Sequence, residues 1–206
     1  MKSVALLSHK GGTGKTTMSL HLGVAAALAN YLTAIIDLDP QASATEWGDS
    51  REAETPAVVS AQASRLAQVM QTAQAGGVDI VLIDTAPLSE TTALAAARAA
   101  DLILVPCRPA ILDLRAIKAT RDLVKLADTP AFVVLNAVPP RGTLDQEARQ
   151  AVALHGLETA PMHWVQRNAF MNSLKDGLTA QEAEPRGKAA QEVAALFDWV
   201  CTRVDL

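Results

Sequence analysis

Aromatic residues and cysteines are scarce in this chain of 206 residues. Phe, Trp and Tyr make up 3% of the sequence, whereas hydrophobic residues make up 50%, so the core must consist mainly of Ala, Val, Leu and Ile. Such small aliphatic side chains allow helices to pack closely on a sheet. The two cysteines, Cys107 and Cys201, stand far apart and form no C-x-x-C pair. This spacing argues against a disulfide framework and a zinc site, and it favours a reducing cytoplasm.

Long apolar runs and a strong net charge are also missing. The apolar run after Lys2 is too short for a signal peptide, and no run approaches the length that spans a bilayer. The last residues, 201–206, form no basic amphipathic segment, so we expect no membrane attachment. The net charge of −4 argues against a uniformly basic nucleic-acid binder, although most of the 18 Lys and Arg residues lie from Arg98 onward.

Short apolar runs alternate with helical patterns along the chain. The runs predict buried strands at residues 4–8, 33–38, 79–83, 102–106 and 131–136, and more weakly at 162–165. The helical patterns cover residues 18–30, 61–75, 89–100, 113–127, 144–155 and 189–204. This alternation predicts an α/β fold, a mostly parallel, twisted sheet with helices on both faces and a ligand at the carboxyl ends of the strands. No linker is long enough to separate two domains, so we expect a single domain over residues 1–206.

One segment has the composition of a phosphate-binding loop, namely His9-Lys10-Gly11-Gly12-Thr13-Gly14-Lys15-Thr16-Thr17. It follows a predicted strand and precedes a predicted helix, as in the P-loop NTPases. Glycines let the backbone approach an anion, and the first amides of a helix point toward it. Lys15 would add positive charge at the β- and γ-phosphates, and the Thr16 hydroxyl would bind Mg²⁺. The alternative is an ordinary glycine-rich turn with surface lysines.

Carboxylates follow two of the apolar runs. Asp37 and Asp39 lie at the exit of the run 33–38, where they face the same side, and Asp84 ends the run 79–83. An aspartate at the end of a buried strand costs desolvation unless a cation or a donor receives it. A bound Mg²⁺ would meet that need. An aspartate before proline also starts turns, which is the other interpretation of Asp39.

The loop K-G-G-x-G-K-[ST] resembles the deviant Walker A loop of the ParA/MinD family of ATPases, with His9 in place of the first glycine of the standard pattern. The D-x-D-P-Q segment at 37–41 resembles that of ParA proteins. Residues 84–87 resemble the loop after their Walker B strand, and residues 185–192 resemble the start of their last helix. Because no N-terminal helix-turn-helix extension is present, the chain resembles a small ParA-type partition ATPase.

The resemblance implies slow, partner-stimulated hydrolysis of ATP with Mg²⁺ as cofactor. In the family, the early lysine (here Lys10) reaches the nucleotide of the partner subunit, and the residue matching Asp39 orients the attacking water. The implied catalytic residues are therefore Lys10, Lys15 and Asp39. The implied nucleotide contacts are Gly11, Gly12, Thr13, Gly14, Lys15, Thr16, Thr17 and, at the adenine, Asn136 and Pro139. The implied metal ligands are Thr16, Asp37 and Asp84, the last through a water. Without the resemblance, Lys10 is also typical of a solvated loop.

The resemblance also implies partners. ATP closes a homodimer, the dimer binds DNA without sequence preference, and a ParB-like or other activating adaptor stimulates hydrolysis and releases it. The implied role is segregation of plasmid or chromosome DNA in the cytoplasm, on the nucleoid. The candidate DNA contacts are Arg186, Lys188 and Arg167. A basic stripe of Arg115, Lys118, Arg121 and Lys125 ranks below them, because a helix that covers a sheet exposes charge for solubility alone.

Four other functions share parts of this pattern. A family ATPase can position a cargo other than DNA, such as a protein compartment or a chemoreceptor cluster, with the same chemistry. An ATP-dependent ligase of the dethiobiotin-synthetase type uses the same scaffold, although D-x-D-P-Q argues against it. An iron-protein-like reductase would need cysteines placed to hold a cluster, and Cys107 and Cys201 do not resemble that arrangement. A non-catalytic, nucleotide-gated scaffold is the remaining alternative, which measurable ATP turnover would dismiss.

Overall fold

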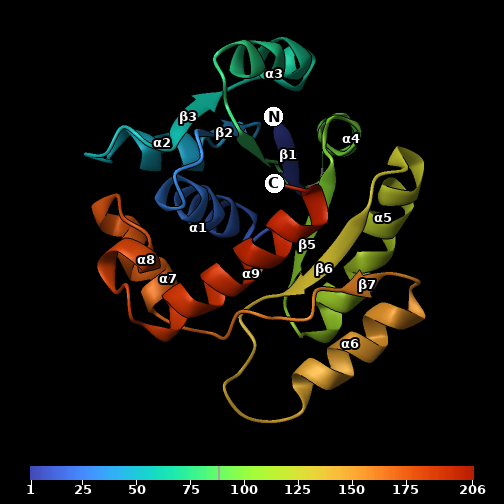
Figure 1. Cartoon of the computed structure of the whole chain (residues 1–206). Coiled ribbons are helices and arrows are strands. Elements are labelled where there is room, and N and C mark those ends of the chain that lie inside the picture. The colour runs from blue at the N-terminus through green and yellow to red at the C-terminus, as the bar shows by residue number, and fades with distance from the viewer. Residues whose placement is uncertain (88) are drawn as a thin grey trace.

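The computed structural model describes residues 1–87 and 89–206, without the side chains of Leu112 and Arg115. Its sheet has seven strands in the order β3-β2-β4-β1-β5-β6-β7 (Figure 1). The strands are β1 Lys2–Leu6, β2 Thr33–Asp37, β3 Ala57–Ser60, β4 Ile80–Asp84, β5 Leu102–Cys107, β6 Ala131–Leu135 and β7 Glu158–Thr159. The α-helices are α1 Lys15–Leu28, α2 Ser43–Asp49, α3 Leu66–Ala75, α4 Glu90–Ala99, α5 Ile111–Ala127, α6 Leu144–Leu154, α7 Ala169–Asn172, α8 Ala180–Ala183 and α9 Lys188–Val204. Short 3₁₀ turns cover Ala63–Arg65 and Ser173–Asp176.

The strands pair in parallel throughout the sheet. Because β4 lies between β1 and β2, Asp84 is the register partner of both Leu6 and Asp37. On the other side of β1, β5 connects it to β6. The carboxyl ends of these central strands therefore meet at one edge, where the loop of residues 9–17 also lies. The predicted α/β class with a parallel sheet is confirmed.

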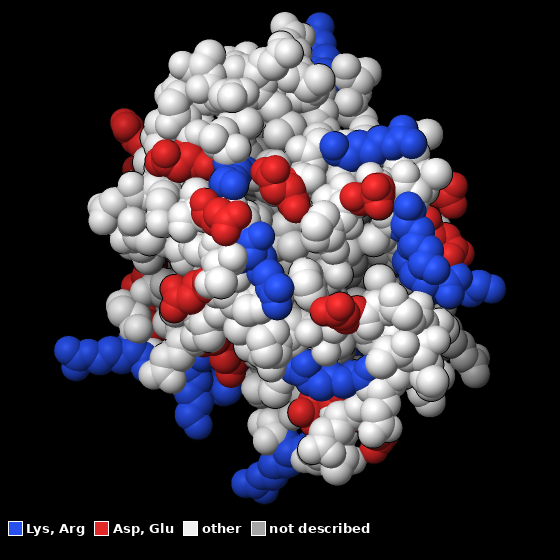
Figure 2. Space-filling model, turned by 45° about the vertical axis from the view of Figure 1, so that its right-hand side comes forward, with Lys and Arg blue, Asp and Glu red and all other residues white. Residues whose placement is uncertain are grey.

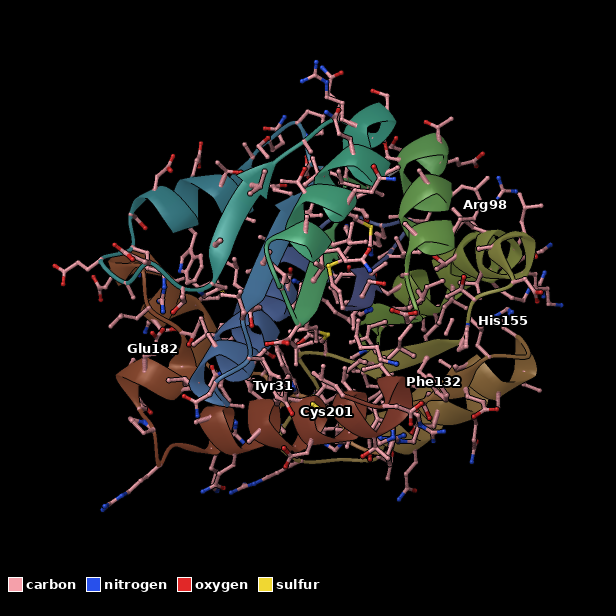
Figure 3. The ribbon with its side chains drawn as sticks, turned by 45° about the horizontal axis from the view of Figure 1, so that its top comes forward. Tyr31, Arg98, Phe132, His155, Glu182 and Cys201 are labelled. Carbon is pink, nitrogen blue, oxygen red and sulfur yellow. The ribbon has the colours of Figure 1, made fainter. Side chains whose placement is uncertain are left out.

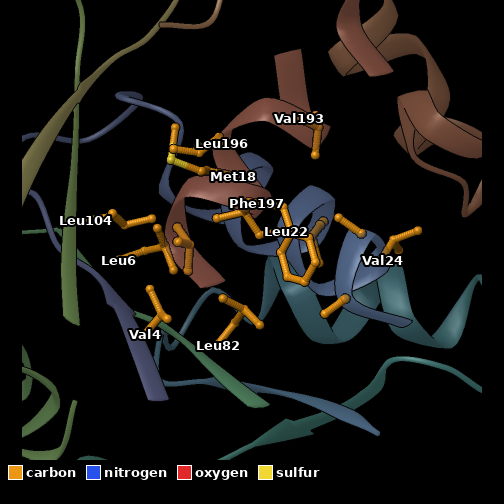
Figure 4. Packing of buried hydrophobic residues seen from close by; sticks show 14 of the residues in the cluster. Val4, Leu6, Met18, Leu22, Val24, Leu82, Leu104, Val193, Leu196 and Phe197 are labelled. Atoms are coloured by element: carbon orange, nitrogen blue, oxygen red, sulfur yellow. The ribbon is translucent and has the colours of Figure 1, made fainter. Parts of the chain in front are cut away.

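The sheet separates two layers of buried side chains, because alternate residues of a strand face opposite sides. In β1, Val4 and Leu6 belong to the layer formed with α1 and α9, part of which Figure 4 shows. Ala5 and Leu7 belong to the opposite layer, to which α4 and α5 contribute. Helices therefore cover both faces, as predicted (Figure 1).

The edges of the sheet differ from the sequence prediction. The weak strand expected at residues 162–165 is wrong, because the last strand is β7, Glu158–Thr159, and Val165 makes only an isolated bridge to Val138. Strand β3 and helix α2 were not predicted. β3 forms the outer edge next to β2 and is largely exposed, and its apolar run, residues 57–59, is shorter than the runs that mark the central strands. The domain organisation stays a prediction.

The few aromatic side chains are concentrated against the helices of one layer. Trp164 is fully buried and stacks on Phe170, with ring centroids 4.7 Å apart and an interplanar angle of 9°. His21 of α1 meets both rings edge-on, at 5.8 and 5.2 Å. Along α9, Tyr31 contacts Phe197 and Phe132 contacts Trp199; Figure 3 labels Tyr31 and Phe132. These contacts attach the C-terminal segment to α1 and to the sheet.

Buried polar groups connect α1 with α8. The Nδ1–H of His21 donates to the Thr17 carbonyl at 2.7 Å, and its Nε2 accepts the Ala180 N–H at 3.2 Å. Burial lowers the pKa of His21 to about 4, so the ring is neutral at pH 7. In α8, the two carboxylate oxygens of Glu182, which Figure 3 labels, accept hydrogen bonds from Arg51 at 2.6 and 2.9 Å. Within the described residues, no helix is long and apolar enough to cross a membrane.

Candidate nucleotide-binding site

The segment of residues 9–17, called the phosphate loop here, ends the connection from β1 to α1 and includes the first residues of the helix, which begins at Lys15. Gly12 and Gly14 have positive φ angles of 72° and 102°, which a side chain would strain. Gly14 is the N-cap residue, and the Met18 N–H donates to its carbonyl at 2.9 Å. The sequence therefore uses glycine at two bends of the loop.

The backbone amides of this loop are available to an anion. No acceptor among the described residues receives a hydrogen bond from the N–H groups of residues 11–17. The first N–H groups of a helix lack partners within the helix, and the helix dipole gives that end a partial positive charge. Lys15 adds a positively charged side chain that is almost fully buried. Burial lowers its pKa below the usual value, and the nearby Asp84 and Asp39 offset only part of this decrease. This arrangement is suited to phosphate groups.

The buried Asp84 pairs with Thr16, a partly buried residue at the start of α1. The Thr16 hydroxyl donates to Asp84 Oδ2 at 2.6 Å, whereas the buried Asp84 Oδ1 has no hydrogen-bond partner among the described residues. Burial raises the pKa of Asp84 to about 7, the Thr16 hydrogen bond opposes that rise, and the nearby Asp37 adds to it. A buried carboxylate oxygen without a donor is costly, so it indicates an external cation.

The donor set fits Mg²⁺ held together with a nucleotide. No group of three or more His, Cys, Asp or Glu residues in the described part of the chain could hold a metal ion by itself. Mg²⁺ is usually bound by one or two carboxylates together with substrate phosphates and waters. Asp84 and Thr16 supply a carboxylate and a hydroxyl at the position where the loop would present those phosphates.

Asp37 has both carboxylate oxygens engaged with donors of its own chain. Its Oδ1 accepts the Asp39 N–H at 3.0 Å, and its Oδ2 accepts the N–H and the hydroxyl of Thr45 at 3.0 and 3.1 Å. These contacts attach the start of α2 to the end of β2. The structure thus assigns Asp37 a supporting function, and its role as a metal ligand stays a prediction.

Asp39 lies two residues beyond β2 and is partly exposed. Its Oδ1 accepts the Gln41 N–H at 3.0 Å, and its own N–H is held by Asp37. The residue borders a hollow of about 810 Å³ that is also lined by Ser60, Arg65 and Thr92. Asp39 is therefore a carboxylate with a fixed backbone and access to solvent, which suits a residue that orients water.

Lys10 forms an ion pair with Asp113 near the start of α5. The lysine side chain is 42% exposed, whereas that of Asp113 is 4% exposed. In a single subunit, Lys10 is thus directed toward its own α5. The predicted reach of Lys10 to a partner subunit would require it to leave this pair.

Asn136, for which an adenine contact was predicted, also contacts the phosphate loop, and the adenine contact stays a prediction. Its Nδ2 donates to the Thr13 carbonyl at 2.7 Å, and its Oδ1 accepts the Ala137 N–H at 2.9 Å. Each end of the side-chain amide thereby makes one hydrogen bond, and a second N–H and a second lone pair are left for a ligand. Pro139 follows half-buried in the next turn, and its contact with adenine stays a prediction.

The three candidate DNA contacts differ in their surroundings. Arg167 forms an ion pair with Glu192, in which Nε and Nη2 both donate to Oε1, at 2.9 and 2.6 Å, and this pair balances its charge and weakens its candidacy. Arg186 and Lys188 are exposed at the start of α9 and form no ion pair within the described residues. The face shown in Figure 2 has acidic side chains interspersed among the basic ones.

The lower-ranked basic stripe on α5 is only partly described. Arg121 pairs with its neighbour Asp122, with Nη2 of the arginine 2.6 Å from the carboxylate, so its charge is also balanced. Lys118 and Lys125 are exposed. The side chain of Arg115 lies outside the described residues, so the stripe as a whole stays a prediction.

Sequence reasoning missed two charged residues at the loop. Asp113 pairs with Lys10, and Arg108 lies beside Gly12, where its Nη2 would be 4.0 Å from an added Cβ. Both follow β5, the neighbour of β1 in the sheet. For Arg108 a usable signal was its position directly after β5, since residues there reach the ligand edge of a parallel sheet, whereas Asp113 lies within α5 and carried no such signal.

Comparison with known proteins agrees with this geometry. The sequence profile of the CobQ/CobB/MinD/ParA nucleotide binding domain matches residues 4–170. The chain belongs to this family. It is 32% identical, over 98% of its length and 93% of the relative, to the maintenance of carboxysome distribution protein A of Gloeobacter kilaueensis.

Solved structures of this family share the fold. The ATP complex of a Cyanothece McdA variant has a TM-score of 0.76 and 17% identity, with 100% of this chain and 97% of that chain covered. The Pyrococcus horikoshii MinD complex with Mg-ADP has a TM-score of 0.77 and 18% identity, with 97% and 95% covered. The resemblance of the sequence to the ParA/MinD family and the predicted P-loop fold are confirmed.

Proposed function

We propose that this ParA/MinD-family chain hydrolyses ATP with Mg²⁺ and uses the hydrolysis to switch between a dimer and a monomer. The observation that carries the proposal is the Thr16–Asp84 pair beside a loop whose amides have no acceptor among the described residues. This combination suits a metal-bound nucleoside triphosphate, because it supplies amide donors, a lysine and an unsatisfied carboxylate oxygen together.

The residues divide the chemistry among them. The loop amides and Lys15 hold the β- and γ-phosphates, and Thr16 and Asp84 hold the metal position. The metal neutralises charge on the phosphate oxygens when it is bound. Asp39 orients the attacking water from the partly exposed turn after β2. Lys10 of the partner subunit adds positive charge at the phosphates, so hydrolysis depends on the dimer.

Replacing Asp39 tests the catalytic part of this proposal. Asp39→Ala should bind ATP and dimerise as the wild type does, but hydrolyse it at least about a hundredfold more slowly, because the water is no longer oriented. Phosphate release and sedimentation velocity measure the two properties. Asp49→Ala, at an exposed aspartate in α2, is the matched control. Normal hydrolysis by Asp39→Ala would remove Asp39 from the mechanism.

For the switched state, we propose that the ATP-bound dimer binds duplex DNA without sequence preference through Arg186 and Lys188. Both are exposed at the start of α9, and two subunits together would double their charge. Neutralisation of phosphates by such residues makes binding depend on salt.

The DNA proposal predicts that an Arg186→Ala, Lys188→Ala double variant weakens ATP-dependent binding and flattens its salt dependence. The matched control is an Arg141→Ala, Lys175→Ala double variant, because both residues are exposed and lie elsewhere. Binding should be measured with ATP, with ADP and without nucleotide. Equal retention of DNA in all three states would reject a nucleotide-controlled switch.

For the cargo, we propose a protein compartment rather than a plasmid or chromosome. The relative named for carboxysome distribution matches nearly the full chain, and this observation favours the non-DNA alternative over DNA segregation. A second similarity, 30% identity over 55% of this chain to the protein ParA of Rhizobium radiobacter, keeps DNA segregation as the second candidate. In either role the protein works in the cytoplasm, on the nucleoid, with an adaptor that stimulates its ATPase.

Deleting the gene in the source cell separates the two cargoes. Clustered or unevenly inherited protein compartments with normal plasmid and chromosome retention support the proposed cargo, and DNA loss with evenly spaced compartments supports segregation. An ATPase assay with purified protein separates both from a ligase. A positioning ATPase releases ADP and phosphate without any acceptor substrate, whereas a ligase turns over only when its acceptor is added.

A further inference from the structure

Arg108 stands at the rim of the phosphate loop, immediately after β5. Its carbonyl accepts the Ala110 N–H at 2.8 Å, and the preceding carbonyl, that of Cys107, accepts the Asn136 N–H at 2.8 Å. Pro109 follows it, and a residue before proline is largely restricted to extended conformations. Because β5 is the neighbour of β1 in the sheet, the backbone of Arg108 is thus held beside the loop that follows β1.

The side chain of Arg108 extends over Gly12. A Cβ added to Gly12 would lie 4.0 Å from Nη2 of the arginine, and both residues are exposed. Gly12 belongs to the part of the loop whose N–H groups have no acceptor among the described residues. The guanidinium group therefore lies next to amides that are available to a phosphate.

The two lysines of the loop already have counter-charges within the chain. Lys10 pairs with Asp113, and Lys15 is attracted by Asp84 and Asp39. Arg108, in contrast, forms no ion pair within the described residues. A positive charge that the chain leaves unbalanced beside free amides is complementary to an anion at that place.

We propose that Arg108 is a phosphate-binding residue that contacts the phosphate chain of the nucleotide in its own subunit. The inference rests on the proposed binding of nucleotide at this loop. Arg108 and the loop it faces belong to the same chain, so the contact forms in a single subunit, unlike the predicted contact of Lys10. A guanidinium group offers several N–H donors in fixed directions, which suits the oxygens of a phosphate.

Binding of two probes to the full chain tests this role. The probes are ATP and inorganic tripolyphosphate, each with Mg²⁺, at a protein concentration where sedimentation velocity shows a monomer. We expect Arg108→Gln to lose about three- to tenfold in affinity for both probes, by similar factors, because each presents a chain of phosphates to the arginine. Competition against a fluorescent nucleotide measures the dissociation constants.

Two further variants separate the charge of Arg108 from a general effect of substitution. Arg108→Lys keeps the positive charge and should bind both probes more tightly than Arg108→Gln does. Arg98→Gln is the matched control and should bind like the wild type. Arg98, which Figure 3 labels, is an exposed arginine near the end of α4 that also forms no ion pair within the described part of the chain.

Three results would overturn the proposal. Unchanged affinity of Arg108→Gln for both probes would leave Arg108 as an exposed surface charge. Normal binding by the monomer with a weaker ATP-bound dimer would assign the arginine to the contact between subunits. Weaker binding of ATP with unchanged binding of tripolyphosphate would assign it to the nucleoside. If the wild-type chain binds neither probe, the proposed nucleotide function itself fails, which is a distinct result.

Discussion

Asp37 and Asp84 end two neighbouring parallel strands, β2 and β4, where they are register partners and both are fully buried. The chain supplies Asp37 with three hydrogen-bond donors, one to Oδ1 and two to Oδ2. It supplies Asp84 with one, from Thr16, and among the described residues Asp84 Oδ1 has none. The difference separates a carboxylate that organises its own backbone from one that has acceptor capacity left for an external cation.

The largest effect is expected for Asp84→Asn. Hydrolysis of ATP should fall at least about a hundredfold, because the metal contributes several kcal/mol to charge stabilisation. The free energy of unfolding without nucleotide should rise at pH 8, above the Asp84 pKa of about 7, because no charged carboxylate is then buried. Phosphate release and urea unfolding measure the two quantities.

The control for this variant is Asp198→Asn, at an exposed aspartate of α9. It should change neither hydrolysis nor stability. Lower stability of Asp84→Asn together with intact hydrolysis would mean that Asp84 resembles Asp37, and the comparison would no longer hold.

Asp37→Asn should show the opposite pattern. The free energy of unfolding should fall by about 2–4 kcal/mol, because an amide cannot accept all three hydrogen bonds and its NH₂ group faces donors. Hydrolysis should fall secondarily, through the loss of the Asp39 N–H anchor. Thr45→Val, which removes the hydroxyl donor alone, should cost about 1 kcal/mol. A stable Asp37→Asn protein with an altered Mg²⁺ requirement would instead identify Asp37 as a metal ligand.

His21 extends the comparison to a buried polar group that the chain satisfies completely. Its pKa is about 4 in the folded protein and 6.5 in the unfolded chain, so below pH 6.5 the unfolded chain binds a proton that the folded protein does not. Stability is therefore complete above pH 6.5 and declines as the pH falls toward 4, by about 3 kcal/mol in total. Urea unfolding at stepped pH measures the decline. It should be smaller in His21→Gln, and an equal decline would assign the pH dependence to other groups.

The smallest effect concerns the ion pair between Lys10 and Asp113, which we expect to open when two subunits meet. Asp113→Asn should favour the ATP-bound dimer by about two- to fivefold, because Lys10 leaves a weaker partner. Sedimentation velocity with a non-hydrolysable ATP analogue measures the dimer fraction. Asp122→Asn, which breaks an exposed pair with Arg121 on the same helix, is the control. A weaker dimer in Asp113→Asn would show that the carboxylate supports the interface.

The sequence was sufficient for the central elements of the fold because their signals are local. The apolar runs of β1, β2, β4, β5 and β6 mark buried strands, and glycines at 12 and 14 adopt the positive φ angles that the loop requires. β3 and β7 escaped prediction because β3 has only three consecutive apolar residues at an exposed edge and β7 consists of two polar residues. The parallel strands at the middle of the sheet can thus be predicted from the alternation of apolar runs and helical patterns, whereas the strands at its edges cannot.

The functional contacts were predictable only in part, for a related reason. Lys10 and Asp113 are 103 positions apart, and Thr13 and Asn136 are 123 positions apart. These pairs meet because β1, β5 and β6 are adjacent in the sheet, an order that spacing along the sequence does not reveal. The loop itself was identified from its residues, but its partners on β5, α5 and β6 required the structure.

Trp164 has a consequence for how this site can be observed. Its ring stacks on Phe170 and meets His21, and His21 in turn donates to the Thr17 carbonyl in the first turn of α1. One ring contact and one hydrogen bond therefore separate a natural fluorophore from the phosphate loop. The chain has three tryptophans, so replacing Trp47 and Trp199 with phenylalanine would leave Trp164 as the single tryptophan. Its emission would report optically on movements of the loop, without any attached dye.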